Sequence, residues 1–158
     1  MRKALRSPLF AAGLVIVFAG TALATGVTGL TPTTFSRGTV TEEVHFNTGA
    51  VKFQTKADVD LVTQTITFAP GATSGWHAHP GVVLVTVASG SLVRYDAKCA
   101  AKTYTDHTAR SAFIESGDHP GLVRNETASP AVVYVTYIVP RGTTALRIDK
   151  ADPNCGPA

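Results

Sequence analysis

Short runs of alternating apolar and polar residues, separated by turn residues, occupy the chain from residue 40 to residue 139. In the clearest run, Val62–Phe68, three apolar side chains and the glutamine share one face, and the three threonines share the other. Such alternation is typical of a β-strand, because successive side chains point to opposite sides. No segment carries the apolar stripe of period 3.6 that a surface helix needs. The sequence therefore predicts an all-β domain.

Further strands are predicted along the same part of the chain. Ser89 and Gly90 lie between two of them and indicate a tight hairpin turn, since glycine readily adopts the positive φ that such turns require. Many short strands at regular spacing are typical of a sandwich or a barrel. The predicted strands are Trp76–His79, Val82–Ala88, Leu92–Asp96, Ala112–Glu115, Leu122–Asn125 and Ala131–Val139.

The first 24 residues have the pattern of a secretory signal peptide. A basic start with Arg2, Lys3 and Arg6 precedes an almost wholly apolar stretch, and Ala22-Leu23-Ala24 offers the small residues that signal peptidase accepts. The alternative is an uncleaved membrane anchor, for which this apolar stretch is short. We therefore expect a secreted or extracytoplasmic protein with no stable membrane span after cleavage.

The excess of basic residues belongs to this predicted signal peptide. Residues 1–24 contain three of the 14 Lys and Arg and none of the 11 Asp and Glu, so both signs are equal in the remainder. A basic surface for nucleic acid therefore has no support in the sequence, and nucleic acid is not expected as a partner.

One domain is expected after the signal peptide. Residues 25–38 are rich in Thr, Gly and Pro and predict a flexible leader, residues 39–140 the barrel, and residues 141–158 a C-terminal tail. Cys99 and Cys155 are the two cysteines of the chain. In an exported protein they predict a disulfide that tethers the tail.

His77 and His79 fall on the same face of a predicted strand, because they are two residues apart. Two imidazoles side by side supply half of a typical first-row metal site. The alternative is a pair of surface or hydrogen-bonded histidines without a metal.

The segment around these histidines resembles the first motif of the cupin superfamily, G-x5-H-x-H-x3-E-x6-G. The residues that match at the motif spacings are Gly71, His77, His79 and Gly90, while Val83 stands where cupins usually place a glutamate ligand. The resemblance implies an antiparallel cupin β-barrel, or jelly roll, over about residues 39–140. It also implies a homodimer, since cupins often pair through sheet edges.

A second segment, residues 113–125, is more loosely similar to the second cupin motif. Gly117 matches the motif glycine, Glu115 stands at its proline position, and Gly121 occupies the place of the usual ligand histidine, four residues before Asn125. His119 lies two residues earlier and, in an extended strand, would face the same interior. The expected metal ligands are therefore His77, His79 and His119.

Cupins commonly bind iron, manganese, zinc, nickel or copper, and the thiol dioxygenases use three histidines without the glutamate. The resemblance thus implies a divalent metal and a small-molecule ligand. If the protein is an enzyme, metal-assisted oxidation is expected; the alternative is a non-catalytic, metal-free binding barrel. His45, His107, Arg94 and Arg124 are expected to be solvated surface residues.

Overall fold

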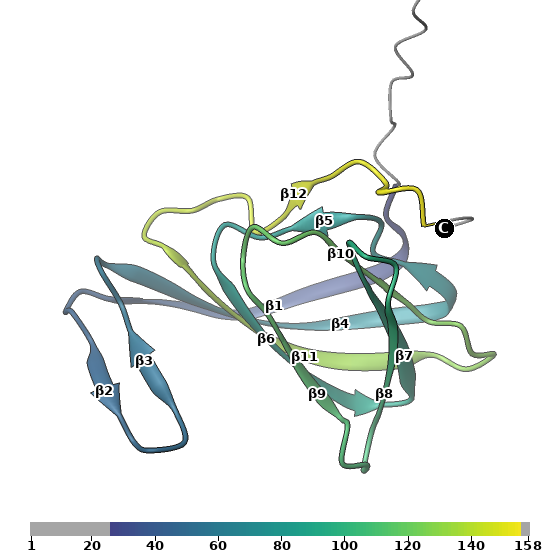
Figure 1. Cartoon of the computed structure of the whole chain (residues 1–158), viewed down its shortest axis with the longest axis horizontal. Coiled ribbons are helices and arrows are strands. Elements are labelled where there is room, and N and C mark those ends of the chain that lie inside the picture. The colour runs from purple at the N-terminus through teal and green to yellow at the C-terminus, as the bar shows by residue number, and fades with distance from the viewer. Residues whose placement is uncertain (1–25, 156–158) are drawn as a thin grey trace, which may run out of the picture.

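The computed structural model describes residues 26–155, and every regular element in this range is a β-strand (Figure 1). The strands are β1 (Thr28–Val40), β2 (His45–Asn47), β3 (Lys52–Gln54), β4 (Val59–Thr73), β5 (His77–Ala78), β6 (Val82–Ser89), β7 (Ser91–Asp96), β8 (Ala101–Thr105), β9 (Ala112–Glu115), β10 (Gly121–Arg124), β11 (Ala131–Pro140) and β12 (Ile148–Asp149).

Ten of these strands form a nearly closed antiparallel barrel. One half has the strand order β1-β4-β11-β6-β9, and the other half has the order β12-β5-β10-β7-β8. The halves join where Arg124 of β10 pairs with Thr73 of β4. The predicted all-β fold, an antiparallel barrel or jelly roll, is confirmed.

The barrel interior is built by alternate residues of the central strands. In β11, burial follows a strict period of two, so that Val133, Val135 and Tyr137 face inward while Tyr134 faces solvent. β6 contributes Val83, Val85 and Val87 to the same interior. Because β-branched side chains suit a pleated, half-buried sheet, these valine-rich strands form a continuous apolar lining.

The segment expected as a flexible leader instead contains strand β1. Thr28–Val40 pairs along its length with β4, from Thr28 opposite Thr73 to Val40 opposite Val59. Nearly all its side chains are exposed. The strand is therefore held mainly by backbone hydrogen bonds rather than by burial, and it lacks the alternation from which a strand could be predicted.

Asp60 fastens β1 to the barrel and to the start of the C-terminal tail. Its carboxylate accepts hydrogen bonds from Arg37 Nη1 at 2.7 Å, Thr39 Oγ1 at 2.8 Å and the Gly142 amide at 3.0 Å. The hydrogen bond from Thr39 lowers the pKa of Asp60 most, followed by the one from Gly142. Desolvation acts to raise this pKa, and Arg37 lowers it further.

We expect Asp60→Asn to lower the free energy of unfolding at pH 7. Because the pKa of Asp60 is lowered in the folded protein, the ionised carboxylate stabilises the fold at pH values above 3.8, its ordinary pKa. This stabilisation is lost as the pH falls through the lower pKa of the folded protein. Urea unfolding from pH 7 down to pH 2 should therefore show the two proteins converging on acidification. A difference that stays constant or grows would contradict this role for Asp60.

The C-terminal tail lies across the strand that carries His77. β12 pairs with β5, with Asp149 opposite His77 and Ile148 opposite Ala78. A disulfide between Cys99 and Cys155 holds the end of the tail against the β7–β8 connection, with the two Cα atoms 5.2 Å apart. The predicted disulfide is confirmed.

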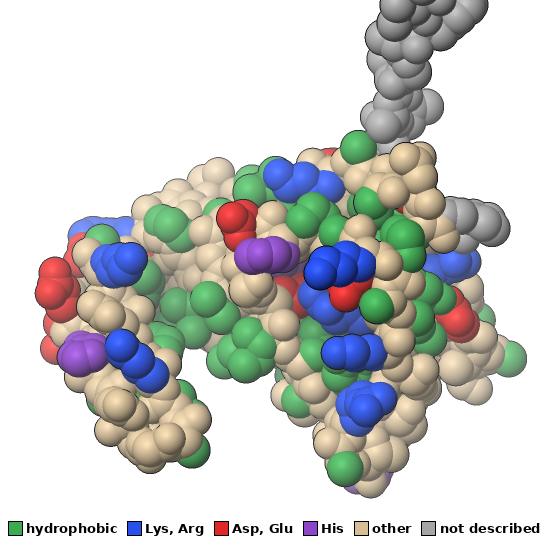
Figure 2. Space-filling model, in the orientation of Figure 1, with side chains coloured by type: hydrophobic (Ala, Val, Ile, Leu, Met, Phe, Trp, Pro, Cys, Tyr) green, Lys and Arg blue, Asp and Glu red, His purple; other side chains and the backbone are tan. Residues whose placement is uncertain are grey.

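The hairpin of β2 and β3 stands away from the barrel (Figure 1). Figure 2 shows hydrophobic side chains in the hollow between this hairpin and the barrel. The outward-facing residues Val82, Leu84 and Tyr134 are among the exposed large hydrophobic residues of the barrel. The expected homodimer stays a prediction.

The predicted signal peptide, and the alternative of a membrane anchor, lie outside the described residues. Within residues 26–155, no helix is long and apolar enough to cross a membrane.

Candidate metal centre

His77 and His79 lie together at one end of the barrel interior. His77 belongs to β5 and His79 directly follows this strand; each is only 7% exposed. Their ring centroids are 4.7 Å apart and the ring planes are nearly perpendicular. Both side chains line the same internal cavity, as their spacing in the sequence predicts.

Backbone carbonyls fix the tautomer of both imidazoles. His77 Nδ1 lies 2.9 Å from the Gly75 carbonyl oxygen, and His79 Nδ1 lies 2.7 Å from that of Leu146. Because a carbonyl can only accept, each Nδ1 carries the proton, and Nε2 of the neutral ring is free to ligate. Burial lowers the pKa of His77 to about 4, so this ring is neutral at physiological pH.

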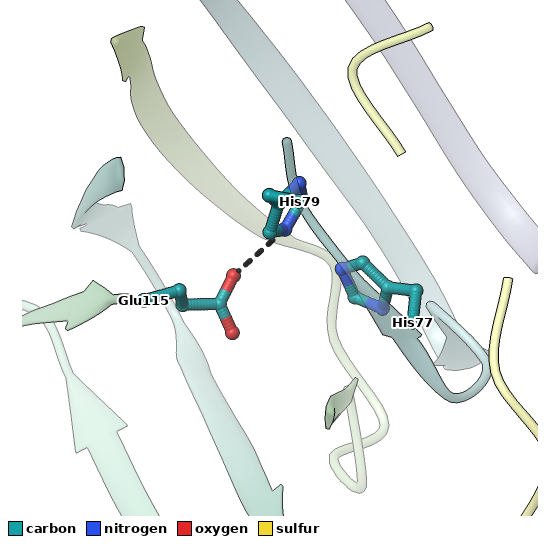
Figure 3. A group of neighbouring side chains, drawn as sticks. All are labelled: His77, His79 and Glu115. Carbon is teal, nitrogen blue, oxygen red and sulfur yellow. Dashed lines mark hydrogen bonds and ion pairs between the residues drawn. The ribbon is translucent and has the colours of Figure 1, made fainter. Parts of the chain in front are cut away.

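Glu115 of β9 supplies a carboxylate to the two histidines, and Figure 3 shows it pointing toward His79. Its Oε2 lies 3.1 Å from His79 Nε2, and its Oε1 accepts a hydrogen bond from Arg94 Nε at 3.1 Å. Burial acts to raise the pKa of Glu115. At the acidic pH where Glu115 titrates, however, a hydrogen bond from the protonated His79 ring and the charges of His79, His77 and Arg94 outweigh burial and lower the pKa to about 2. The carboxylate is therefore ionised at neutral pH.

The contact between His79 and Glu115 requires a positive charge between the two atoms. Nδ1 of His79 already carries the ring proton, so Nε2 of the neutral ring presents a lone pair to the carboxylate. Two lone pairs 3.1 Å apart repel one another. Either a second proton on the imidazole or a metal ion bound by both atoms removes this repulsion.

The three side chains fit a divalent metal. Their ligand atoms all lie within 4.8 Å of one another. Two ligand atoms about 2.1 Å from one metal and at a right angle are about 3 Å apart, which matches the contact between His79 and Glu115. Two histidines and one carboxylate form a recognised ligand set for non-haem iron, and imidazole also suits zinc, copper and nickel.

The carboxylate of this site comes from the strand next to the one where cupins usually place it. Val83 of β6, at the usual glutamate position, pairs directly with Glu115 of β9. Both residues face the cavity. Glu115 lies in a predicted strand, at the proline position of the second motif, but a single sequence gives no register between two strands, so the role of Glu115 was missed.

Arg94 lies beside Gly121, the glycine that stands where the second cupin motif usually has a ligand histidine. A Cβ atom added to Gly121, at the usual histidine position, would lie 3.3 Å from Glu115 Oε1 and 3.4 Å from Arg94 Nη2. A histidine there would compete with the arginine for space. The expectation that Arg94 is solvated is wrong, because its side chain is only 19% exposed and is bound to Glu115.

His119 is not brought together with His77 and His79. Its side chain is 76% exposed and its Nδ1 lies 3.0 Å from both Ser116 Oγ and Asp118 Oδ1. The residue belongs to the loop between β9 and β10 rather than to a strand. His45 and His107 are exposed, as expected.

The candidate site lies in a cavity of about 280 Å³ that is partly open to solvent. Apart from the site residues, its walls are mainly aliphatic and aromatic. The ring of Tyr137 packs 5.6 Å from that of His79. Burial, with a smaller effect of Glu115, raises the pKa of Tyr137 to about 12, so its hydroxyl stays protonated.

No protein-family model matches the chain, and no match was found among curated proteins. Similar solved structures include a cupin superfamily protein from Desulfitobacterium hafniense, with 6% identity, a TM-score of 0.49, and coverage of 75% of this chain and 84% of that chain. A Cupin 2 conserved barrel domain protein from Leptotrichia buccalis has 15% identity, a TM-score of 0.49, and coverage of 73% and 44%. The Cupin_2 domain of an XRE family transcriptional regulator from Enterobacter cloacae has 25% identity, a TM-score of 0.43, and coverage of 51% and 83%.

Proposed function

We propose that the protein is an extracytoplasmic metal-binding barrel that holds a small molecule beside a divalent transition metal. His77, His79 and Glu115 would hold the metal. The observation that carries this proposal is the 3.1 Å contact between His79 Nε2 and Glu115 Oε2. Nδ1 of the same ring already donates a hydrogen bond to the Leu146 carbonyl.

The surroundings of the three ligands support the proposal. Metal-binding histidines usually donate their second ring N–H to a carbonyl or carboxylate, and ligand carboxylates are in turn hydrogen-bonded. His77, His79 and Glu115 all have such partners, in Gly75, Leu146 and Arg94 respectively. The disulfide supports an oxidising compartment outside the cytoplasm.

The residues around the proposed metal determine how a small molecule would bind beside it. A divalent metal held by His77, His79 and Glu115 would supply Lewis acidity or, as iron, oxygen chemistry. The apolar walls would contact the apolar part of a bound molecule. Arg94 donates a hydrogen bond to Glu115 Oε1 and so holds the carboxylate with Oε2 toward His79. The identity of the small molecule decides whether the site only binds or also catalyses.

A metal-free binding barrel is the second candidate function. Within the described residues, every fully buried side-chain nitrogen or oxygen has a hydrogen-bond partner, so the site is also satisfied with a protonated His79 in place of a metal. This alternative predicts the same cavity and a ligand bound through apolar contact alone.

Metal titration distinguishes the two functions and the two ligand sets. The protein, purified without a histidine tag and stripped with chelator, is titrated with Zn²⁺, Mn²⁺ and Fe²⁺ while bound metal is measured by mass spectrometry. We expect one equivalent in the wild type, loss of binding in His77→Ala and His79→Ala, and full binding in His119→Ala. Binding that is absent in the wild type, or that depends on His119, would overturn the proposed site.

A further inference from the structure

The cavity is polar at the candidate metal site and mainly apolar along the rest of its lining. Gln64, a polar residue elsewhere in the lining, already donates a hydrogen bond to Thr34. His77, His79 and Glu115 lie at the polar end, and the rest of the lining is mainly apolar, with Ile66, Phe68, Val85, Phe113, Val133 and Val135. Such a division favours a ligand that has one polar group and one apolar part, because an apolar wall gives nothing to a second polar group.

Tyr137 presents a hydrogen-bond donor at the polar end. The residue is only 6% exposed and lines the cavity from the inner face of β11. Every fully buried side-chain oxygen within residues 26–155 has a hydrogen-bond partner, and no such partner holds the Tyr137 hydroxyl, so this hydroxyl is accessible from the cavity. A ligand oxygen beside His79 would accept a hydrogen bond from this accessible hydroxyl.

The charges around the metal favour a negative ligand. Glu115 carries the one negative charge among the proposed ligands, and Arg94 already matches it in an ion pair. Arg147, which also lines the cavity, is paired with Asp149. A divalent metal would therefore leave about two positive charges without a counter-charge in an apolar cavity, which is costly unless an anion binds.

We infer that the cavity binds an amphipathic organic anion, with a carboxylate-like oxygen group at the metal and the Tyr137 hydroxyl, and an apolar tail along the barrel. This inference rests on the proposed metal site and adds the chemical class of its ligand. A cavity of about 150 Å³ accommodates benzene, so about 280 Å³ suits a ligand of roughly ten heavy atoms.

Calorimetric titration of the zinc-loaded protein with 3-phenylpropanoate and its neutral isostere 3-phenylpropanamide tests the charge requirement. We expect the acid to bind at least 10-fold more tightly than the amide, because only the acid brings a negative charge to the metal. Acetate has the same charged group without the tail, and we expect it to bind at least 10-fold more weakly than 3-phenylpropanoate.

Two tyrosines of β11 provide a matched pair of variants. Tyr137→Phe removes the inward hydroxyl and should weaken binding of the acid about 10-fold, the range expected for a hydrogen bond to a charged group. Tyr134→Phe is the same change at a position that is 54% exposed, and it should bind like the wild type. Metal content is measured in every sample.

Two outcomes in samples that retain metal would overturn the inference and leave the proposed metal site intact. One is equal affinity for the acid and the amide; the other is equal affinity for the acid in Tyr137→Phe and Tyr134→Phe. Failure of the wild type to retain metal would overturn the proposed function, and the inference with it.

Discussion

Glu115→Val is expected to abolish stoichiometric metal binding, and the added change Val83→Glu is expected to restore it. The two residues face the cavity as a directly opposed pair on β6 and β9. Opposed residues have Cβ atoms about 5 Å apart, so a glutamate at either position can present its carboxylate to His77 and His79. We expect the single variant to lose at least 100-fold in metal affinity, because it removes a ligand rather than a partner of one.

Glu115→Gln serves as the control for folding in this series. It keeps the shape of the side chain and a hydrogen-bonding oxygen for Arg94, yet it removes the charge that attracts a metal. Thermal unfolding without metal shows whether each variant is folded, and metal binding is compared only among those that are. Wild-type affinity in a folded Glu115→Val variant would contradict the role of Glu115.

Removing the disulfide is expected to lower the free energy of unfolding by about 4 kcal/mol. Cys99 and Cys155 are 56 residues apart, and closing a loop of this length restricts the unfolded chain by about that amount. Urea unfolding of wild type and of Cys99→Ser/Cys155→Ser measures the difference. Reducing agent should destabilise the wild type and leave the double variant unchanged.

The same double variant should bind metal about 10-fold more weakly. The tail tethered by the disulfide carries Leu146, whose carbonyl orients His79, and β12, which pairs with the strand of His77. Loss of a partner that orients a metal ligand typically costs 10- to 100-fold in affinity. Unchanged metal affinity in the destabilised variant would show that the tail does not support the site.

The alternation of residues along single strands was enough to predict most of the barrel. β6, β9 and β11 each bury every second residue, so the pattern and the structure agree there. β1 was missed because its side chains are exposed and leave no pattern. Backbone pairing along a sheet edge depends on the position of β4 in space, which sequence periodicity does not encode.

The two histidines of the candidate site were predicted from the sequence, but its carboxylate was not, because the carboxylate depends on how two strands pair. The spacing of His77 and His79 placed both side chains in one cavity. The inclusion of His119 assumed an extended strand, whereas Gly117, with φ of 85°, and Pro120 lie in a loop that turns the histidine outward. Val83 and Glu115 are 32 positions apart in sequence, and their pairing depends on the register between β6 and β9, which a single sequence does not specify.

Anomalous X-ray diffraction from crystals of the metal-loaded protein, measured at the absorption edge of the bound metal, tests the central claim most directly. We predict one strong peak per chain, about 2.0 to 2.2 Å from His77 Nε2, His79 Nε2 and Glu115 Oε2, as expected for zinc bound by nitrogen and oxygen. A peak at His119 or elsewhere on the surface, with His79 Nε2 still in direct contact with Glu115, would contradict it.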